Sequence, residues 1–141
     1  MTFSGAEKAA IAYIWGKVAG QTDELGAEAL ERQFLSYPQT KTYYSKYNMS
    51  HGSPDLLSQG GKLMNFIGKA ASQLDDLKGA LSPIIDLHAN QLRVNPGDYT
   101  ILWCAIQVTL AAHFGSEFSP TVYAAWDKFL NAISAVMTST Y

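Results

Sequence analysis

The chain has few side chains suited to chemistry: three histidines and one cysteine among 141 residues. One histidine, His88, lies within the apolar stretch IIDLHANQLRV. Its spacing to Ile84, Ile85 and Leu92 places all four side chains on one face of a helix. The imidazole therefore points where the apolar side chains point. This spacing alone favours a core histidine bonded to a backbone carbonyl over a metal ligand.

A second polar side chain interrupts another apolar face. Gln59, within LLSQGGKL, follows the helical stripe that contains Leu56 and Leu63. A single buried neutral imidazole can ligate an iron porphyrin, and a polar group on the other side can hydrogen-bond what binds there. Haem also requires an apolar slot with cations at its rim. The basic residues available for the haem propionates are Lys46, Lys62 and Arg93.

Other kinds of chemistry find little support. The sequence has no G-x-x-x-x-G-K-[ST] phosphate loop, no C-x-x-C and no H-E-x-x-H. Cys104 stands in the apolar run ILWCAIQV, which predicts a packed small hydrophobe rather than a nucleophile. His51 stands in a polar loop, where we expect it to be solvated, and His113 ends an apolar run, where it can interact with terminal helix carbonyls. Neither has a carboxylate at a sequence spacing typical of a catalytic dyad.

Composition predicts one folded domain over residues 1–141. Apolar residues make up 48% and charged residues 16%, which permits a sizeable core. The net charge of −2 without a Lys/Arg cluster argues against binding to nucleic acid. We expect no secretory signal and no membrane span. A single cysteine suits a reducing interior, so we expect a cytoplasmic protein.

Helix starts are marked by capping residues directly before prolines. A Ser or Asn side chain accepts an unpaired backbone N–H, and proline needs no donor at the first helical position. These pairs are Ser53-Pro54, Ser82-Pro83, Asn95-Pro96 and Ser119-Pro120, and Ser4 with Glu7 has the spacing of a capping box. The apolar period is helical, which predicts an all-α fold. We expect helices at about 4–18, 21–36, 54–74, 82–91, 96–113 and 120–138, a short turn at 38–43 and an ordered loop at 44–52.

Longer motifs carry a family resemblance. The stretches GAEALERQFLSYPQTKTYY, DLHANQLRVNPGDY, QVTLAAHF, EFSP and AAWDKFLNAISAVMTS occur in order along the chain. Together they resemble the α-type subunit of vertebrate haemoglobin, a member of the globin family, over essentially the whole sequence. The resemblance implies the globin fold, about seven helices around a pocket for haem b (iron protoporphyrin IX). It also implies an oxygen-transport subunit, not an enzyme, that binds O₂ and CO reversibly at a histidine-ligated iron.

The resemblance assigns roles position by position. His88 matches the proximal iron ligand, and Gln59 takes the place of the distal histidine on the O₂ side. Leu63 and Leu30 match residues beside and above the ligand. Tyr44 stands where the family has a phenylalanine stacked on haem. Lys46 and Lys62 match rim positions near the propionates, and the remaining porphyrin contacts are Leu87, Leu92, Val94, Tyr99, Leu102 and Met137.

Two glycines also match family positions. Gly26 and Gly60 fall where two helices cross closely, and a side chain at either position would force the backbones apart.

The implied partners are β-type globin chains, in a heterodimer or heterotetramer within red blood cells. Arg32, Phe118 and the helix from Pro120 match the more static contact between the chains. The positions that meet the partner in the low-affinity tetramer are Thr42, Tyr43, Arg93 and Tyr141. The chain departs from the family by inverting the Asp/Asn pair at Asn95 and Asp98 and by lacking the terminal arginine. Asp98 would then face a carboxylate of the partner, which predicts weaker tetramers.

Two alternative functions stay open. The altered distal side encourages a globin with haem-based peroxidase or nitrite chemistry, but no side chain near Gln59 offers acid–base catalysis at neutral pH. A helical interaction module without a cofactor requires that His88 be a plain core residue.

Overall fold

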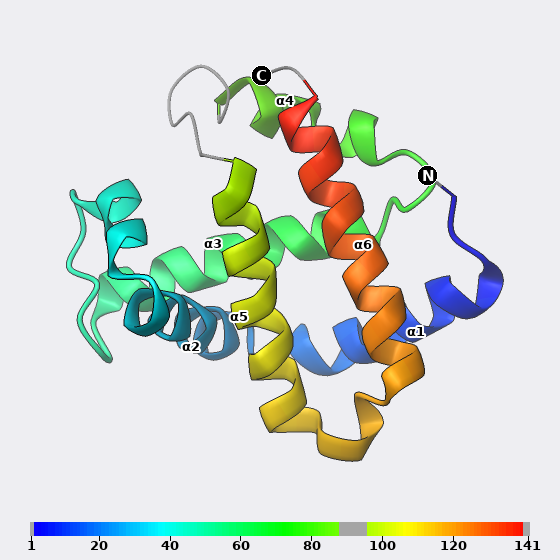
Figure 1. The fold of residues 1–141 in the computed structure, drawn as a ribbon, viewed down its shortest axis with the longest axis horizontal. Helices are drawn as coiled ribbons and strands as arrows, with labels where there is room; N and C mark the ends of the chain where they lie inside the picture. The colour runs from blue at the N-terminus through cyan, green and yellow to red at the C-terminus, as the bar shows by residue number, and fades with distance from the viewer. Residues whose placement is uncertain (1, 88–95, 140–141) are drawn as a thin grey trace.

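A computed structural model describes residues 2–87 and 96–139, and within these residues it contains helices and no strand (Figure 1). The predicted all-α class is therefore confirmed. The α-helices are α1 (Gly5–Val18), α2 (Thr22–Ser36), α3 (Pro54–Ala71), α4 (Leu77–Leu87), α5 (Pro96–Phe114) and α6 (Pro120–Thr138). The described residues also form the short 3₁₀ helices η1 (Pro38–Tyr44) and η3 (Gly115–Glu117). None of the described helices is long and apolar enough to cross a membrane.

Capping side chains start three of the helices as the sequence predicts. Ser4 and Glu7 form a reciprocal capping box at α1, with Ser4 N donating to Glu7 Oε1 at 2.8 Å. At α3 the Ser53 hydroxyl accepts the backbone N–H of Leu56 at 3.1 Å. At α6 the Ser119 hydroxyl accepts the backbone N–H of Val122 at 3.3 Å. Local capping thus fixes where these helices begin.

The predicted start of the fourth helix at residue 82 is wrong, because α4 begins at Leu77 and contains Pro83. The cap is Asp76, whose carboxylate accepts the backbone N–H of Gly79 at 3.1 Å. Pro83 offers no N–H to the carbonyl of Gly79 one turn earlier. The Ser82 hydroxyl donates to that carbonyl at 3.3 Å instead, so the serine compensates for the proline within the helix rather than capping it.

Two hydrophobic clusters form the core. The large cluster packs α1, α5 and α6 together and includes the fully buried residues Ile11, Ile14, Trp126, Phe129 and Leu130. The small cluster comprises Ala27, Leu30, Phe34 and Leu56, from α2 and the start of α3. In Figure 1, α5 and α6 run side by side in opposite directions, while α2, η1 and the start of α3 gather to one side of them.

Helices α2 and α3 cross at two glycines, as the sequence predicts. A Cβ on Gly26 would collide with the backbone of Gly60, and a Cβ on Gly60 would collide with the backbone of Gly26 and Ala27. Only glycine permits this approach. The crossing holds α3, which carries the predicted distal residues, directly against α2.

Candidate functional site

Leu63 and Leu102 lie between the two clusters. Each is half-buried and packs against both the large and the small cluster. Leu30 is fully buried in the small cluster, and Tyr99 and Met137 are buried in the large one. Helices α2, α3, α5 and α6 thus bring five of the predicted pocket residues into two adjoining apolar surfaces. Leu63 and Leu102 retain apolar exposure where these surfaces meet.

Gln59 is placed on α3 one turn before Leu63. Its side chain is half-buried, and it has no hydrogen-bond partner among residues 2–87 and 96–139. A half-buried amide offers two donors on nitrogen and an acceptor oxygen. No described residue therefore occupies the donors of Gln59, which lies on the helix that also carries Leu63.

Tyr44 closes η1 beside the small cluster. Its ring meets Phe34 edge-on, with centroids 5.5 Å apart and an interplanar angle of 69°. The residue is half-buried, and this burial raises the pKa of the phenol above its usual value. The hydroxyl thus stays protonated at neutral pH and has no hydrogen-bond partner within the described part of the chain.

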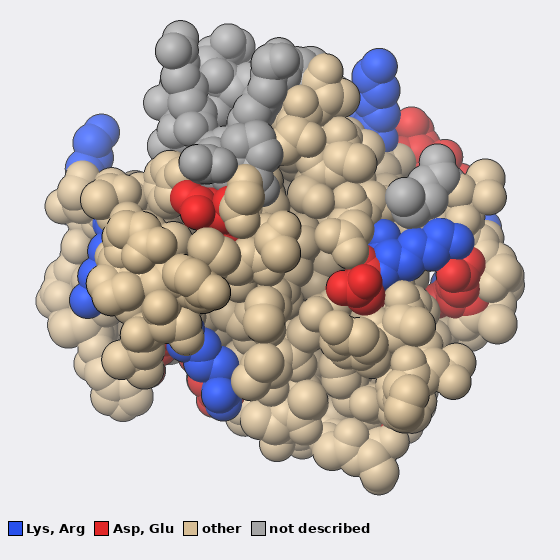
Figure 2. All heavy atoms as spheres, viewed as in Figure 1, with Lys and Arg blue, Asp and Glu red and all other residues tan. Residues whose placement is uncertain are grey.

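Lys46 and Lys62 are exposed, and within the described ranges neither forms an ion pair. By contrast, Lys8, Lys17 and Lys128 each contact a carboxylate. On the face shown in Figure 2, basic side chains are scattered, several of them beside acidic ones, and do not gather into one patch. Among the described residues no carboxylate neutralises Lys46 or Lys62, which suits both to bind an anion.

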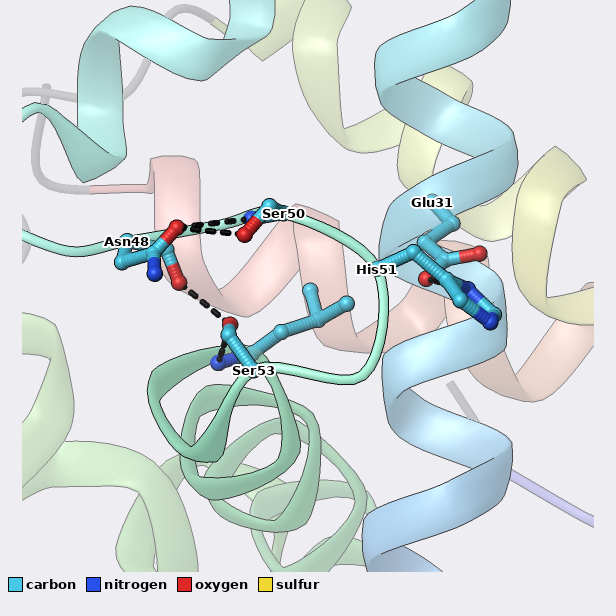
Figure 3. Close-up of polar contacts among 6 residues, drawn as sticks. Glu31, Asn48, Ser50, His51 and Ser53 are labelled. Carbon is cyan, nitrogen blue, oxygen red and sulfur yellow. Dashed lines mark hydrogen bonds and ion pairs between the residues drawn. The ribbon is translucent and has the colours of Figure 1, made fainter.

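The loop between η1 and α3 is held by its own polar side chains (Figure 3). The Asn48 side-chain oxygen accepts the backbone N–H of Ser50 at 3.2 Å and its hydroxyl at 2.6 Å. The Ser53 hydroxyl donates to the Asn48 carbonyl while it caps α3. Asp55 also accepts the Asn48 backbone N–H at 2.9 Å. These bonds order residues 48–55 between Lys46 and the helix that carries Gln59.

The structure pairs both described histidines with glutamates of α2. His51 is exposed as predicted, but its Nδ1 lies 2.6 Å from Glu31 Oε1 (Figure 3). His113 Nε2 lies 2.9 Å from Glu28 Oε1, so this side chain forms a hydrogen bond with a carboxylate of another helix, which the sequence does not predict. These contacts join residues 20 and 85 positions apart. Local spacing in the sequence carries no signal for them.

The prediction that Cys104 is packed is wrong, because the residue is exposed. The surrounding run is apolar on every side, but α5 buries only part of its circumference, including Trp103, Ile106 and Leu110. Cys104 and Val108, one turn apart, lie on the opposite exposed face. The apolar run therefore indicates that α5 packs in the core, but it does not indicate which face of the helix is buried.

Asp98 makes a bond within the chain. The hydroxyl of Tyr43 in η1 donates to Asp98 Oδ2 at the start of α5, at 2.7 Å. The family resemblance predicts partner contacts for both residues, and no local pattern indicates this bond, because 55 positions separate them.

Several predicted residues lie outside the described part of the chain. These are His88, Leu92, Arg93, Val94, Asn95 and Tyr141. Leu87 ends α4, and its side chain is likewise not described. Their roles stay predictions.

Comparison with known proteins shows the family to which this chain belongs. Residues 27–137 match the globin family. The chain is 62% identical to haemoglobin subunit alpha-5 of Xenopus laevis over 141 residues, which covers 100% of this chain and 99% of that protein. It is 50% identical to a larval haemoglobin subunit alpha of Pleurodeles waltl and 48% identical to haemoglobin subunit pi of Gallus gallus, with the same coverage in both cases.

Proposed function

Because the chain belongs to the globin family, among the α-type haemoglobin subunits, we propose that it is an oxygen-transport subunit binding O₂ and CO reversibly through haem b. The full-length similarity to haemoglobin subunits is the observation that carries this proposal. We take residues 1–141 as one globin domain, acting in the cytoplasm of red blood cells.

The described residues fit a haem. A porphyrin needs broad apolar walls, and Leu63 and Leu102 hold half-exposed apolar surface where the two clusters adjoin. Its propionates need cations, and Lys46 and Lys62 have no carboxylate partner in the described ranges. Haem iron, held by a histidine, would supply the reversible binding of diatomic ligands. We assign that histidine as His88.

Each remaining residue then has a role that follows from its own chemistry. The Gln59 amide would donate a hydrogen bond to bound O₂, as a neutral imidazole would. Unlike imidazole, the amide does not titrate near neutral pH, so no protonated distal side chain arises under mild acid. Leu30 and Leu63 exclude water on the same side. Tyr44 covers the haem edge, and the other assigned haem contacts are Leu87, Leu92, Val94, Tyr99, Leu102 and Met137.

We further propose that β-type globin chains bind on the surface formed by α2, α5 and α6. Leu35, Val108 and Tyr123 are exposed there, with relative accessibilities of 82%, 47% and 46%. These three helices contact one another in the order α2, α5, α6. A partner chain docked on these helices would bury such apolar side chains. A Val108→Lys variant should lose association with a β-type chain in sedimentation velocity while keeping its helicity.

The decisive experiment replaces the assigned iron ligand. We expect His88→Gly to lose most of its haem, seen as loss of the Soret band after gel filtration, because His88 is the residue that we assign as the iron ligand. Added imidazole should restore the band. His51→Gly and His113→Gly are the matched controls and should keep haem. Full haem occupancy of His88→Gly without imidazole contradicts the proposal.

A second experiment addresses the distal side. Gln59→Leu removes the amide donors while keeping the volume similar, so O₂ dissociation should accelerate in stopped-flow measurements. CO accepts a hydrogen bond more weakly, and its dissociation should change less. Equal effects on the two ligands would mean that Gln59 does not contact the ligand.

A further inference from the structure

One hydrogen bond ties the two sides of the proposed haem pocket together. The Tyr43 hydroxyl donates to Asp98 Oδ2 at 2.7 Å, and the pair is partly buried. Tyr43 belongs to η1, which packs against α2, whereas Asp98 is the third residue of α5. The bond therefore crosses from the side of the small cluster to the first turn of a helix that belongs to the large cluster.

The chemistry of this bond favours persistence. A phenol that donates to a carboxylate forms a charge-assisted bond, which is shorter and stronger than a neutral one. Asp98 also lies in the first turn of α5, where the helix dipole favours a negative charge. Both residues are half-buried, so water competes less than it would at an open surface.

The immediate neighbours of the pair are assigned haem contacts. Tyr44 follows Tyr43, and its ring packs against Phe34 in the small cluster. Tyr99 follows Asp98, is buried, and its ring lies 5.9 Å from that of Trp103 in the large cluster. A bond that fixes Tyr43 to Asp98 thereby limits how far Tyr44 can move relative to Tyr99.

We propose that Tyr43 and Asp98 are positioning residues that set the spacing between η1 and α5 and thereby tune O₂ release within the single subunit. The inference rests on the proposed oxygen-binding function. Neither residue needs to touch haem or ligand, since each acts through its neighbour. The bond accounts for a carboxylate at position 98 by a contact within the chain.

The test uses a double-mutant cycle on the haem-loaded subunit, with Tyr43→Phe, Asp98→Ala and both together. Hydrogen exchange, corrected for intrinsic rates, should accelerate about three- to tenfold in residues 38–44 and also in residues 97–103 for each single variant. The double variant should show no more than the larger single effect, because the Tyr43–Asp98 bond is lost in both single variants and in the double variant. O₂ dissociation should accelerate in the same variants, and Asp98→Asn, which keeps an acceptor oxygen, should restore part of both effects.

Tyr47→Phe is the matched control: it removes a phenol hydroxyl from an exposed tyrosine in the same corner and should leave exchange and O₂ dissociation unchanged. Exchange changes confined to the substituted segment, effects that multiply in the double variant, or unchanged O₂ dissociation would each overturn the positioning role. Failure of the proposed function is separate, because it appears as absence of a Soret band in the unmodified chain. In that case the hydrogen-exchange measurements on the same three variants, made without haem, still test whether the bond couples η1 to α5.

Discussion

The two core clusters differ in how completely this chain fills them. Around the large cluster, α1, α5 and α6 bury aromatic and branched side chains fully, including Trp126, Phe129 and Ile133. The small cluster has four buried members, and its other neighbours are only half-buried: Tyr44, Met49, Leu57, Leu63 and Leu102. The large cluster also has half-buried neighbours, Leu63 and Leu102 among them, but its fully buried members far outnumber them. In the small cluster the half-buried neighbours outnumber the buried members, so more of its apolar surface is left to cover.

This difference distinguishes residues that stabilise the fold by packing against one another from half-buried residues that a bound cofactor would cover. Close packing makes the interior of the large cluster, away from its proposed haem contacts Tyr99 and Met137, insensitive to what binds elsewhere, since its side chains contact one another. The small cluster gains contacts only when a broad apolar group enters beside it. A substitution in the first region should therefore cost the same with and without haem, whereas a substitution in the second should not.

The largest effect is expected from truncating a leucine of the large cluster, which we compare with truncating a leucine beside the small cluster. Leu130→Ala should lower the free energy of unfolding by about 2–5 kcal/mol, because it leaves a cavity in a fully packed core. The loss should be similar in haem-free and haem-loaded protein. Leu63→Ala should cost less in the haem-free protein, where the side chain is half-exposed, and more once haem is present. Urea denaturation of all four forms measures both differences.

Equal costs for Leu63→Ala in the two forms would contradict the comparison, because the side chain would then gain nothing from the cofactor. The comparison would also be contradicted if the loss of unfolding free energy caused by Leu130→Ala differed between the haem-free and the haem-loaded protein.

The next effect concerns the crossing that holds the small cluster in place. Gly60→Ala should lower the free energy of unfolding by about 2–3 kcal/mol, because its Cβ meets backbone rather than a flexible side chain. Gly16→Ala is the control, since Gly16 lies in α1 with open space around it. That change should stabilise the chain by about 0.5–1 kcal/mol through helix propensity. Thermal unfolding followed by circular dichroism distinguishes the two, and a neutral Gly60→Ala would show that the crossing can separate.

The sequence predicts the structure correctly where short-range interactions determine it. Capping residues placed the starts of α1, α3 and α6, because a cap acts within three residues. The prediction is wrong at Ser82. A serine before a proline can cap a helix, but it can also donate to the carbonyl that the proline leaves without an N–H inside a helix. The prediction for Cys104 is also wrong, because an evenly apolar helix does not reveal its covered face.

At the proposed site, the identities of Gln59, Leu63 and Tyr44 followed from the family resemblance, and their half-burial required the fold. The polar contacts Tyr43–Asp98, His113–Glu28 and His51–Glu31 connect distant parts of the chain and have no local signature. Long-range polar pairing is therefore the part of this site that sequence patterns predict least.

A smaller effect is expected at the mouth of the proposed pocket. Tyr44→Phe keeps the ring contact with Phe34 and removes a hydroxyl that has no partner in the described part of the chain. The free energy of unfolding should change by less than about 1 kcal/mol in the haem-free protein. A loss of several kcal/mol by urea denaturation would show that the hydroxyl is held in a specific bond.

The smallest effect comes from a polar tie on α2, the helix that supports the small cluster. Burial acts to raise the pKa of Glu28, but hydrogen bonds from His113 and Arg32, both at 2.9 Å, outweigh it and leave the pKa below its usual value of 4.5. A carboxyl with a lowered folded-state pKa stabilises the fold above its unfolded value, and that stability is lost as pH falls through the folded value. The contribution should thus be complete at pH 6 and vanish progressively below about pH 4.5.

Because the Glu28 side chain is about a third exposed, we expect this contribution to be below about 1 kcal/mol. Glu28→Gln should lower the free energy of unfolding at pH 6, and the gap to the unmodified chain should close as the pH falls below 4.5. Urea denaturation of both proteins across this range measures the gap directly. A gap that stays constant with pH would show that the glutamate acts through packing rather than charge. A gap that widens in acid would reverse the assigned sign of the pKa shift.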